Sequence, residues 1–290
     1  MEQLRDLVRR LESAADQAGA AAPAQDSLSS VMDTATAAAP PVLSTEEIAV
    51  CYVNPTEPIV GHNRKHAGTE RFRLLCHRLR QSAQYRPLRS LLVTSLIPRE
   101  GKTVVALNVA ATLAFNTPRV VLVDTDMRRS GVRESLGLPP MKGLADCLEG
   151  RASLQEALRR IEPLGIYCLP AGSTDGNPAE LLAGAPLRQC IAELGRAFDW
   201  VVIDSPPLKP FADAHYIANF ADGVLLVMRA GCTPRQGVQQ ALSSLNGANF
   251  VGAVLNSSDE ADDILYYGYY GEKRKQEEAA APAGHAGAAG

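Results

Sequence analysis

The stretch that most constrains the fold is residues 91–109, LLVTSLIPREGKTVVALNV. It begins with an apolar run typical of a buried strand, turns at Pro98 and Gly101, and continues from Lys102 as an apolar segment suited to a buried helix. In a strand, tight loop and helix that starts with Gly-Lys-Thr, backbone N–H groups and the positive helix end surround a triphosphate. We therefore expect Lys102 to contact the β- and γ-phosphates and the Thr103 hydroxyl to ligate Mg²⁺.

The match to the full phosphate-loop pattern G-x-x-x-x-G-K-[ST] is incomplete, because Leu96 occupies the position of the first glycine. An ordinary strand–turn–helix with an exposed lysine is therefore an alternative interpretation of this stretch alone. Under the nucleotide interpretation, the residues expected to line the phosphates are Pro98, Arg99, Glu100, Gly101, Lys102, Thr103 and Val104.

The rest of the core alternates apolar strands with helices. Strands are predicted at 119–123, 165–169, 200–203, 223–228 and 250–255, and helices at 67–83, 143–161, 211–220 and 234–246, with short broken helices within 178–197. Continuously apolar strands separated by helices indicate a mostly parallel sheet covered on both faces. The predicted fold class is therefore α/β.

Polar side chains follow several of these strands. Asp124 and Asp126 come after one, Asp204 after another, and Asn256 ends the last. Ligands of such sheets bind beyond the carboxyl ends of the strands, so we expect these residues to meet the Gly-Lys-Thr loop. Thr103, Asp126 and Asp204 are the expected Mg²⁺ ligands, Asp124 a group that orients or deprotonates a nucleophile, and Asn256 a contact to the purine. The alternative is that the aspartates cap the next helices and the asparagine belongs to a turn.

Composition narrows the partners and the compartment. The formal net charge is −3, which does not favour nucleic acid as a partner. No apolar run is long enough for a transmembrane helix, and the charged start MEQLRDLVRRLE has no signal-peptide core. Six scattered cysteines without a C-x-x-C pair fit free thiols in a reduced cytosol. These features predict a cytoplasmic protein.

Three regions are expected along the chain. Residues 1–43 hold an amphipathic helix followed by an Ala/Pro-rich linker that is disordered by composition. Residues 44–258 form the α/β domain. Residues 259–290 form a flexible tail with a cluster of four tyrosines, Tyr266, Tyr267, Tyr269 and Tyr270, whose flanking charges and glycines argue against a packed core.

These features together resemble the bacterial tyrosine kinases (BY-kinases) of the CpsD/CapB and Wzc type, including the autokinases of exopolysaccharide loci. The resemblance rests on P-R-E-G-K-T, V-D-T-D-M-R, V-V-I-D-S-P-P and the tyrosine tail, and covers roughly residues 65–271. It implies a P-loop NTPase fold in which Lys102 and Thr103 belong to Walker A, Asp124 and Asp126 to a second Walker motif, and Asp204 to Walker B.

The resemblance further implies Mg-ATP-dependent autophosphorylation on the tail tyrosines in capsule or exopolysaccharide synthesis and export. It also implies an activating membrane-bound chain-length or export partner, recruitment to the inner face of the membrane, and ring-like self-association. Two positions depart from the family pattern. Arg99 stands where a loop glycine is common, and Cys76 stands where the ring helix motif, matched by Glu70 and Arg73, has a second arginine.

Two other functions remain open at this point. A ParA/MinD-type ATPase switch shares the sheet and the acidic loops, but its signature lysine would fall at Ile97, and such proteins lack a tyrosine tail. A catalytically silent relative would bind ATP and its partner only.

Overall fold

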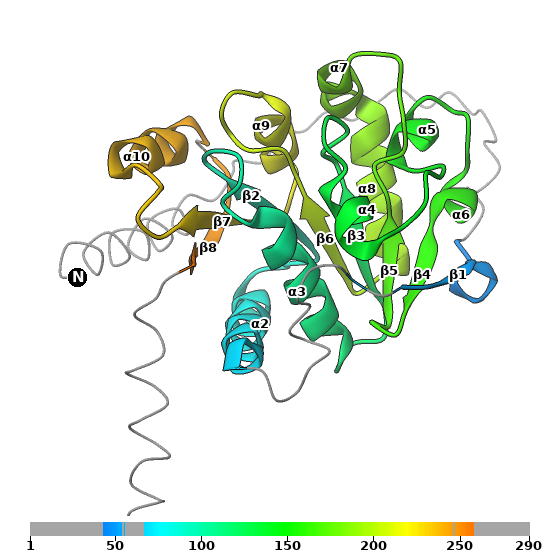
Figure 1. The fold of residues 1–290 in the computed structure, drawn as a ribbon, viewed down its shortest axis with the longest axis horizontal. Helices are drawn as coiled ribbons and strands as arrows, with labels where there is room; N and C mark the ends of the chain where they lie inside the picture. The colour runs from blue at the N-terminus through cyan, green and yellow to red at the C-terminus, as the bar shows by residue number, and fades with distance from the viewer. Residues whose placement is uncertain (1–42, 54, 56–66, 246, 258–290) are drawn as a thin grey trace, which may run out of the picture.

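The computed structural model describes residues 43–53, 55, 67–245 and 247–257 (Figure 1). The amphipathic helix and linker expected within residues 1–42 and the tyrosine tail from residue 258 onward lie outside the described residues, so those expectations stay predictions. None of the helices in the described ranges is long and apolar enough to span a bilayer. The six cysteines all fall within these ranges and are free thiols.

The centre of the molecule is an eight-stranded sheet in the order β1-β4-β5-β3-β6-β2-β7-β8. All neighbouring strands pair in parallel except β4 and β5, which are antiparallel. This confirms the mostly parallel α/β sheet. The strands are β1 Val50–Tyr52, β2 Ser90–Ser95, β3 Val120–Asp124, β4 Arg159–Glu162, β5 Ile166–Leu169, β6 Trp200–Asp204, β7 Gly223–Arg229 and β8 Phe250–Asn256.

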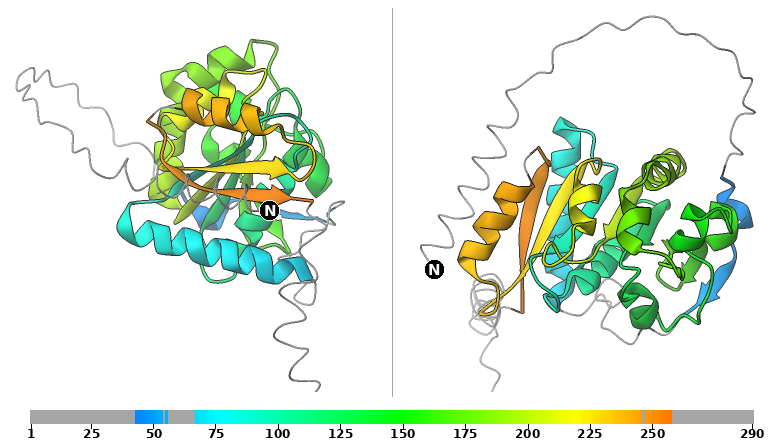
Figure 2. Two further views of the ribbon diagram at one scale, coloured as in Figure 1. Left: turned by 90° about the vertical axis from the view of Figure 1, so that its left-hand side faces the viewer. Right: turned by 90° about the horizontal axis from the view of Figure 1, so that it is seen from above.

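Helices cover both faces of the sheet, as its apolar strands require. On one face, α2 (Ala67–Tyr85), α3 (Lys102–Ala114) and α4 (Gly131–Leu136) pack against alternate strand residues such as Leu91, Val93 and Leu122. The opposite face carries α5 (Leu144–Leu148), α6 (Leu154–Ala157), α7 (Pro178–Ala183), α8 (Ala185–Ala197), α9 (Asp213–Ala218) and α10 (Arg235–Ser244). Figure 2 shows α2 and α10 on opposite sides of the sheet. The fold is therefore three-layered, with one apolar core on each side.

The prediction of one helix over residues 143–161 is wrong. The sequence analysis predicted one long helix, but α5 ends before Gly150, which has a left-handed φ of 73°. A capping box between Ser153 and Glu156 then starts the four-residue α6, and the chain continues as β4, which pairs with β5. The expectation failed because a local signal was overridden by a cap and by pairing with a strand later in the sequence. The short elements β1 and α4 were also not foreseen.

The topology places the ends of β2, β3 and β6 at one edge. The chain leaves β2 through α3 and passes over β6 to β3, whereas from β6 it passes over β2 to β7. This reversal of direction at β2 and β6 is the point at which open α/β sheets bind ligands. In the register, Val93 of β2 pairs with Asp204 of β6, and Asp204 pairs with Asp124 of β3. The residues after these strands therefore meet at one point.

Candidate active site

The loop between β2 and α3 folds back in a tight turn. Arg99 and Gly101 both adopt left-handed backbone angles, with φ of 67° and 89°. At Gly101 a side chain is also excluded by space, since a Cβ there would lie 2.1 Å from Nδ2 of Asn256. Arg99 stands at the position where the bacterial tyrosine kinase pattern has a glycine. Glycine tolerates a positive φ more easily than arginine, so Arg99 is a strained residue in this loop. The turn leads the N–H groups of the first turn of α3 toward the site.

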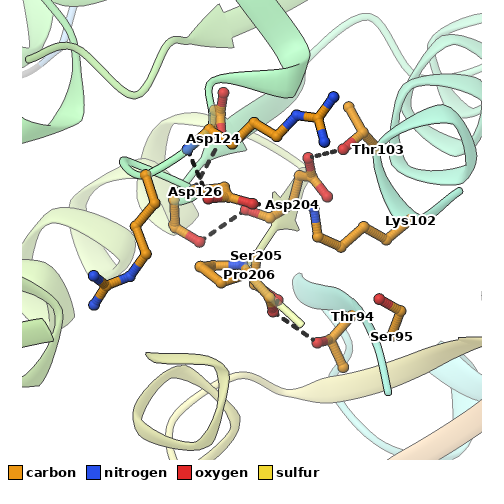
Figure 3. Close-up of polar contacts among 12 residues, drawn as sticks. Thr94, Ser95, Lys102, Thr103, Asp124, Asp126, Asp204, Ser205 and Pro206 are labelled. Atoms are coloured by element: carbon orange, nitrogen blue, oxygen red, sulfur yellow. Dashed lines mark hydrogen bonds and ion pairs between the residues drawn. The ribbon is translucent and has the colours of Figure 1, made fainter. Parts of the chain in front are cut away.

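Lys102 and Thr103, the first residues of α3, contact the two acidic loops (Figure 3). Lys102 Nζ lies 3.2 Å from Asp126 Oδ2, with both side chains largely buried. Thr103 Oγ1 donates a hydrogen bond of 2.7 Å to Asp204 Oδ2. Below them, Thr94 Oγ1 donates to the Pro206 carbonyl at 3.1 Å, which ties the end of β2 to the segment after β6. The structure thus brings together the lysine, the threonine and the carboxylates expected from the sequence.

Asp124 and Asp204 lie side by side on neighbouring strands and are fully buried. Burial, together with the charge of Asp204, raises the pKa of Asp124 well above its usual range. Burial also raises the pKa of Asp204 from 3.8 to about 6, although Lys102 and the Thr103 hydroxyl oppose the change. For Lys102, burial acts to lower the pKa, but the nearby carboxylates outweigh it and the pKa is raised. The site is a cluster of buried carboxylates that a cation would stabilise.

One carboxylate oxygen in this cluster has no hydrogen-bond partner in the protein. Asp204 Oδ1 is buried and makes no hydrogen bond, although Oδ2 of the same side chain is bonded to Thr103. A buried unpaired carboxylate oxygen beside a hydroxyl suits Mg²⁺, which takes oxygen ligands. Within the described ranges, no three His, Cys, Asp or Glu side chains gather closely enough to hold a metal by themselves. The residues therefore fit a Mg²⁺ ion whose other ligands are phosphate oxygens and water.

Asp124 and Asp126 are also tied into their own loop. Asp126 N donates to Asp124 Oδ1 at 3.0 Å, and Ser130 Oγ donates to Asp124 Oδ2 at 3.3 Å. Asp126 Oδ1 accepts from the backbone N–H of Arg129, also at 3.0 Å. These carboxylates fix the backbone of the loop after β3 while facing Lys102 and Asp204. The described bonds stay within that loop and do not cap α4, whose N-cap residue Ser130 makes no side-chain cap hydrogen bond.

Asn256 lies beside the loop, as expected, but both ends of its amide bond the protein. Nδ2 donates to the Glu100 carbonyl at 3.0 Å, and Oδ1 accepts from the N–H of Ser257 at 2.9 Å. Base recognition by Asn256 stays a prediction. Of the two observed contacts, one is to the phosphate loop and the other is to the neighbouring backbone at Ser257.

Other residues at this edge were missed by the sequence analysis. Glu100 was expected only to line the phosphates, yet it is 1% exposed and bonds Thr233. Arg128 donates through Nε to the fully buried Asp213 at 3.1 Å and lies 4.3 Å over the ring of Phe211. Glu100 and Arg128 carried a sequence signal, as parts of P-R-E-G-K-T and V-D-T-D-M-R. Thr233, Phe211 and Asp213 have none, because their partners come from distant parts of the chain.

The helix expected to carry the self-association motif is α2, which lies apart from this site. Glu70 and Arg73 form an ion pair on its exposed side. Cys76 is fully buried, and its thiol lies 3.7 Å from the Val109 carbonyl of α3, so it does not share that exposed surface. Arg78 and Arg80, two further arginines of α2, are the candidates to replace the missing one. Arg78 is exposed, whereas Arg80 turns inward to donate to the Leu113 carbonyl.

Comparisons with known proteins agree on one group of enzymes. No family model matches the sequence. The tyrosine-protein kinase YwqD of Bacillus subtilis is 30% identical over 211 residues, which span 72% of this chain and 89% of YwqD. The succinoglycan biosynthesis transport protein ExoP of Rhizobium meliloti is 35% identical over 176 residues, or 59% of this chain and 22% of ExoP. Among solved structures, the kinase domain of the Escherichia coli tyrosine kinase ETK matches with a TM-score of 0.68 and 25% identity, covering 73% of this chain and 85% of that one.

Proposed function

Because this chain belongs to the bacterial tyrosine kinases, we propose that it is a Mg-ATP-dependent autokinase that phosphorylates its own C-terminal tyrosines and thereby regulates capsule or exopolysaccharide synthesis and export. The observation that carries the proposal is the joining of Lys102 to Asp126 and of Thr103 to Asp204 at the phosphate loop. The named relatives favour this function over a ParA/MinD-type switch. A catalytically silent relative is an outcome that the experiment below distinguishes.

In this proposal the phosphates of ATP lie over the first turn of α3. The loop residues 98–104 supply backbone N–H groups, and Lys102 Nζ, now beside Asp126, neutralises charge on the β- and γ-phosphates. Thr103, Asp126 and Asp204 would hold Mg²⁺ with phosphate oxygens, and the ion supplies charge neutralisation on the transferring phosphoryl group. The buried, unpaired Oδ1 of Asp204 supports this ligand set.

Asp124 is proposed to face the acceptor tyrosine. Its raised pKa reflects burial beside Asp204, and a cation in the site would lower that pKa again. A strong base is not required, since the loose transition state of phosphoryl transfer depends mainly on positioning and charge neutralisation. We therefore assign Asp124 the role of orienting the tyrosine hydroxyl and accepting its proton. The bond from the tyrosine oxygen to the γ-phosphorus would form as the bond from that phosphorus to the β,γ-bridging oxygen breaks, and ADP would leave.

The acceptors are proposed to be Tyr266, Tyr267, Tyr269 and Tyr270. The end of β8, from which the chain continues to the tail, lies beside the phosphate loop, because Asn256 contacts Glu100. From Asn256 to Tyr270 an extended chain spans about 45–50 Å, enough to reach a neighbouring subunit.

We propose transfer mainly between subunits of a ring-like assembly in which the exposed Glu70 and Arg73 of α2 take part. Each phosphate adds about −1.5 to −2 charges to an already acidic tail, so repulsion from the acidic loops would loosen the assembly.

The cellular setting is also part of the proposal. ExoP is by name a polysaccharide transport protein, and its similarity to this chain supports a role beside an export system. We propose that a membrane-bound chain-length or export partner recruits this cytoplasmic protein to the inner face of the membrane and activates it.

A mixing experiment tests the proposed function. Lys102→Met protein with an intact tail is incubated with Mg-ATP and an active protein whose four tail tyrosines are Phe. Phosphotyrosine on the Lys102→Met chain is expected, as the phosphate loop of one chain would serve the tail of another. No phosphotyrosine there, with strong labelling of wild type alone, would indicate transfer within one chain. No labelling of wild type with its partner present would indicate a silent relative.

A further inference from the structure

Glu100 is a buried acid in the middle of the phosphate loop. It is 1% exposed, and both of its carboxylate oxygens accept hydrogen bonds. Oε2 accepts from the backbone N–H of Ile97 at 3.0 Å, which closes the loop upon itself. Oε1 accepts from the hydroxyl of Thr233, a residue in the connection between β7 and α10. Burying a carboxylate costs free energy unless hydrogen bonds replace its lost hydration. The two bonds to Glu100 provide that compensation.

Thr233 is itself fixed by the end of β7. Its Oγ1 accepts from the backbone N–H of Arg229 at 2.8 Å. The hydroxyl that holds Glu100 is therefore anchored to the last residue of β7, a strand of the sheet that lies between β2 and β8. This anchoring gives the loop a rigid contact on the side opposite the acidic residues.

A second contact holds the backbone of the same residue. The carbonyl of Glu100 accepts from Nδ2 of Asn256, at the end of the neighbouring strand β8. The residues on either side of Glu100 are Arg99 and Gly101, the two left-handed positions of the turn. Side chain and backbone of Glu100 are thus both tied to β7 and β8 at the point where the loop is most strained.

We propose that Glu100, Thr233 and Asn256 are positioning residues that hold the phosphate loop in its nucleotide-binding shape before the nucleotide arrives. The inference rests on the proposed function, since it assumes that this loop binds the phosphates of ATP. Without the brace, Arg99 would return to an unstrained backbone angle and the loop N–H groups would diverge. Binding would then require the loop to be reordered, which lowers affinity without removing any group that touches the ligand.

The first test compares two changes at Glu100. The measurement is the dissociation constant for ADP and for inorganic tripolyphosphate, by calorimetry on the full chain with Mg²⁺. Glu100→Ala removes both bonds and should weaken binding of both ligands about tenfold or more. Glu100→Gln should stay within about threefold of wild type, because the amide oxygen can accept from Ile97 and the amide NH₂ can donate to Thr233. Wild-type affinity in Glu100→Ala would overturn the proposal.

Thr233→Val provides an independent arm with a matched control. It removes only the hydroxyl, and we expect affinity to fall about threefold to tenfold, with little additional loss when it is combined with Glu100→Ala. Thr174→Val removes a similar hydroxyl-to-carboxylate bond, 2.6 Å to Glu149, in a loop outside the brace, and should leave affinity unchanged. If Glu100→Ala does not fold, the affinity of Thr233→Val alone tests the proposal. Equal losses in Thr233→Val and Thr174→Val would contradict the brace.

Asn256 is tested by ligand discrimination. A brace lowers affinity for ATP, GTP and tripolyphosphate by the same factor in Asn256→Ala, whereas a base contact affects ATP and spares tripolyphosphate. Selective loss of ATP would remove Asn256 from the brace and assign it to the purine. Absence of any ADP or tripolyphosphate binding by wild type would instead contradict the proposed function, so the two failures are distinguishable.

Discussion

Replacing Asp204 by asparagine should make the protein more stable and remove its response to Mg²⁺. Burial raises the pKa of this carboxyl from 3.8 to about 6, so at pH 7 the folded protein keeps ionised a group that its surroundings disfavour. A difference of this size corresponds to at most about 3 kcal/mol of destabilisation. Asparagine carries no charge, and its oxygen can still accept the hydrogen bond from Thr103.

The expected gain in the free energy of unfolding is smaller than the destabilisation caused by the charge of Asp204. The amide NH₂ would take the place of Oδ1, which has no partner in the structure, and an unpaired buried donor costs about 1–2 kcal/mol. The net increase in the free energy of unfolding is then about 1–2 kcal/mol, or about 2–8 °C in Tm for a domain of this size. The assay is thermal unfolding without ligands and in the presence of Mg²⁺ plus ADP. These ligands should raise the Tm of wild type far more than that of Asp204→Asn.

The pH dependence provides the control. The folded state holds the Asp204 proton more tightly than the unfolded state, so wild-type stability should fall as the pH rises from about 4 to about 6 and level off above it. This fall and its levelling off describe the contribution of Asp204 alone, and that contribution should be absent in Asp204→Asn. A lower Tm for the variant at pH 7 without ligands, or an undiminished response to Mg²⁺ and ADP, would refute the reasoning.

Two further predictions concern the phosphate loop. Lys102→Met should lower the phosphorylation rate about 100-fold or more in a folded protein, because a cation facing the phosphates is lost; rates near wild type, measured alongside circular dichroism, would remove Lys102 from catalysis. Arg99→Gly should raise the free energy of unfolding by up to about 1 kcal/mol, since glycine accepts the φ of 67° without strain although it adds entropy to the unfolded chain. Destabilisation of Arg99→Gly in urea titration would show that the arginine side chain makes compensating contacts.

Periodicity and composition were sufficient to predict much of the fold. The strands around the site are continuously apolar, and each is separated from the next by a helix, so the parallel sheet and the edge that carries Asp124, Asp126 and Asp204 followed directly. The helix expected over 143–161 failed because Gly150 and the Ser153 cap interrupt it, and because β4 forms only by pairing with β5.

The site was foreseen in its residues more than in its contacts. Short-range patterns identified Lys102 and Thr103 together with the aspartates after strands, since parallel strands end at a common edge. The bond from Thr233 to Glu100 joins residues 133 positions apart, and no local pattern indicates it. Asn256 was placed at the right strand end, but which group its amide bonds depends on the approach of Gly101, which only the folded chain shows.

The central claim is that this chain transfers phosphate from ATP to its own tail tyrosines. The most direct measurement is tandem mass spectrometry of the purified full chain after incubation with Mg-ATP and its membrane partner's cytoplasmic segment. The account predicts phosphate on one or more of the four tyrosines between Tyr266 and Tyr270, and none in Lys102→Met or in wild type given EDTA. An unmodified tail under conditions in which ATP binds, or equal tail phosphorylation in the Lys102→Met protein, would contradict it.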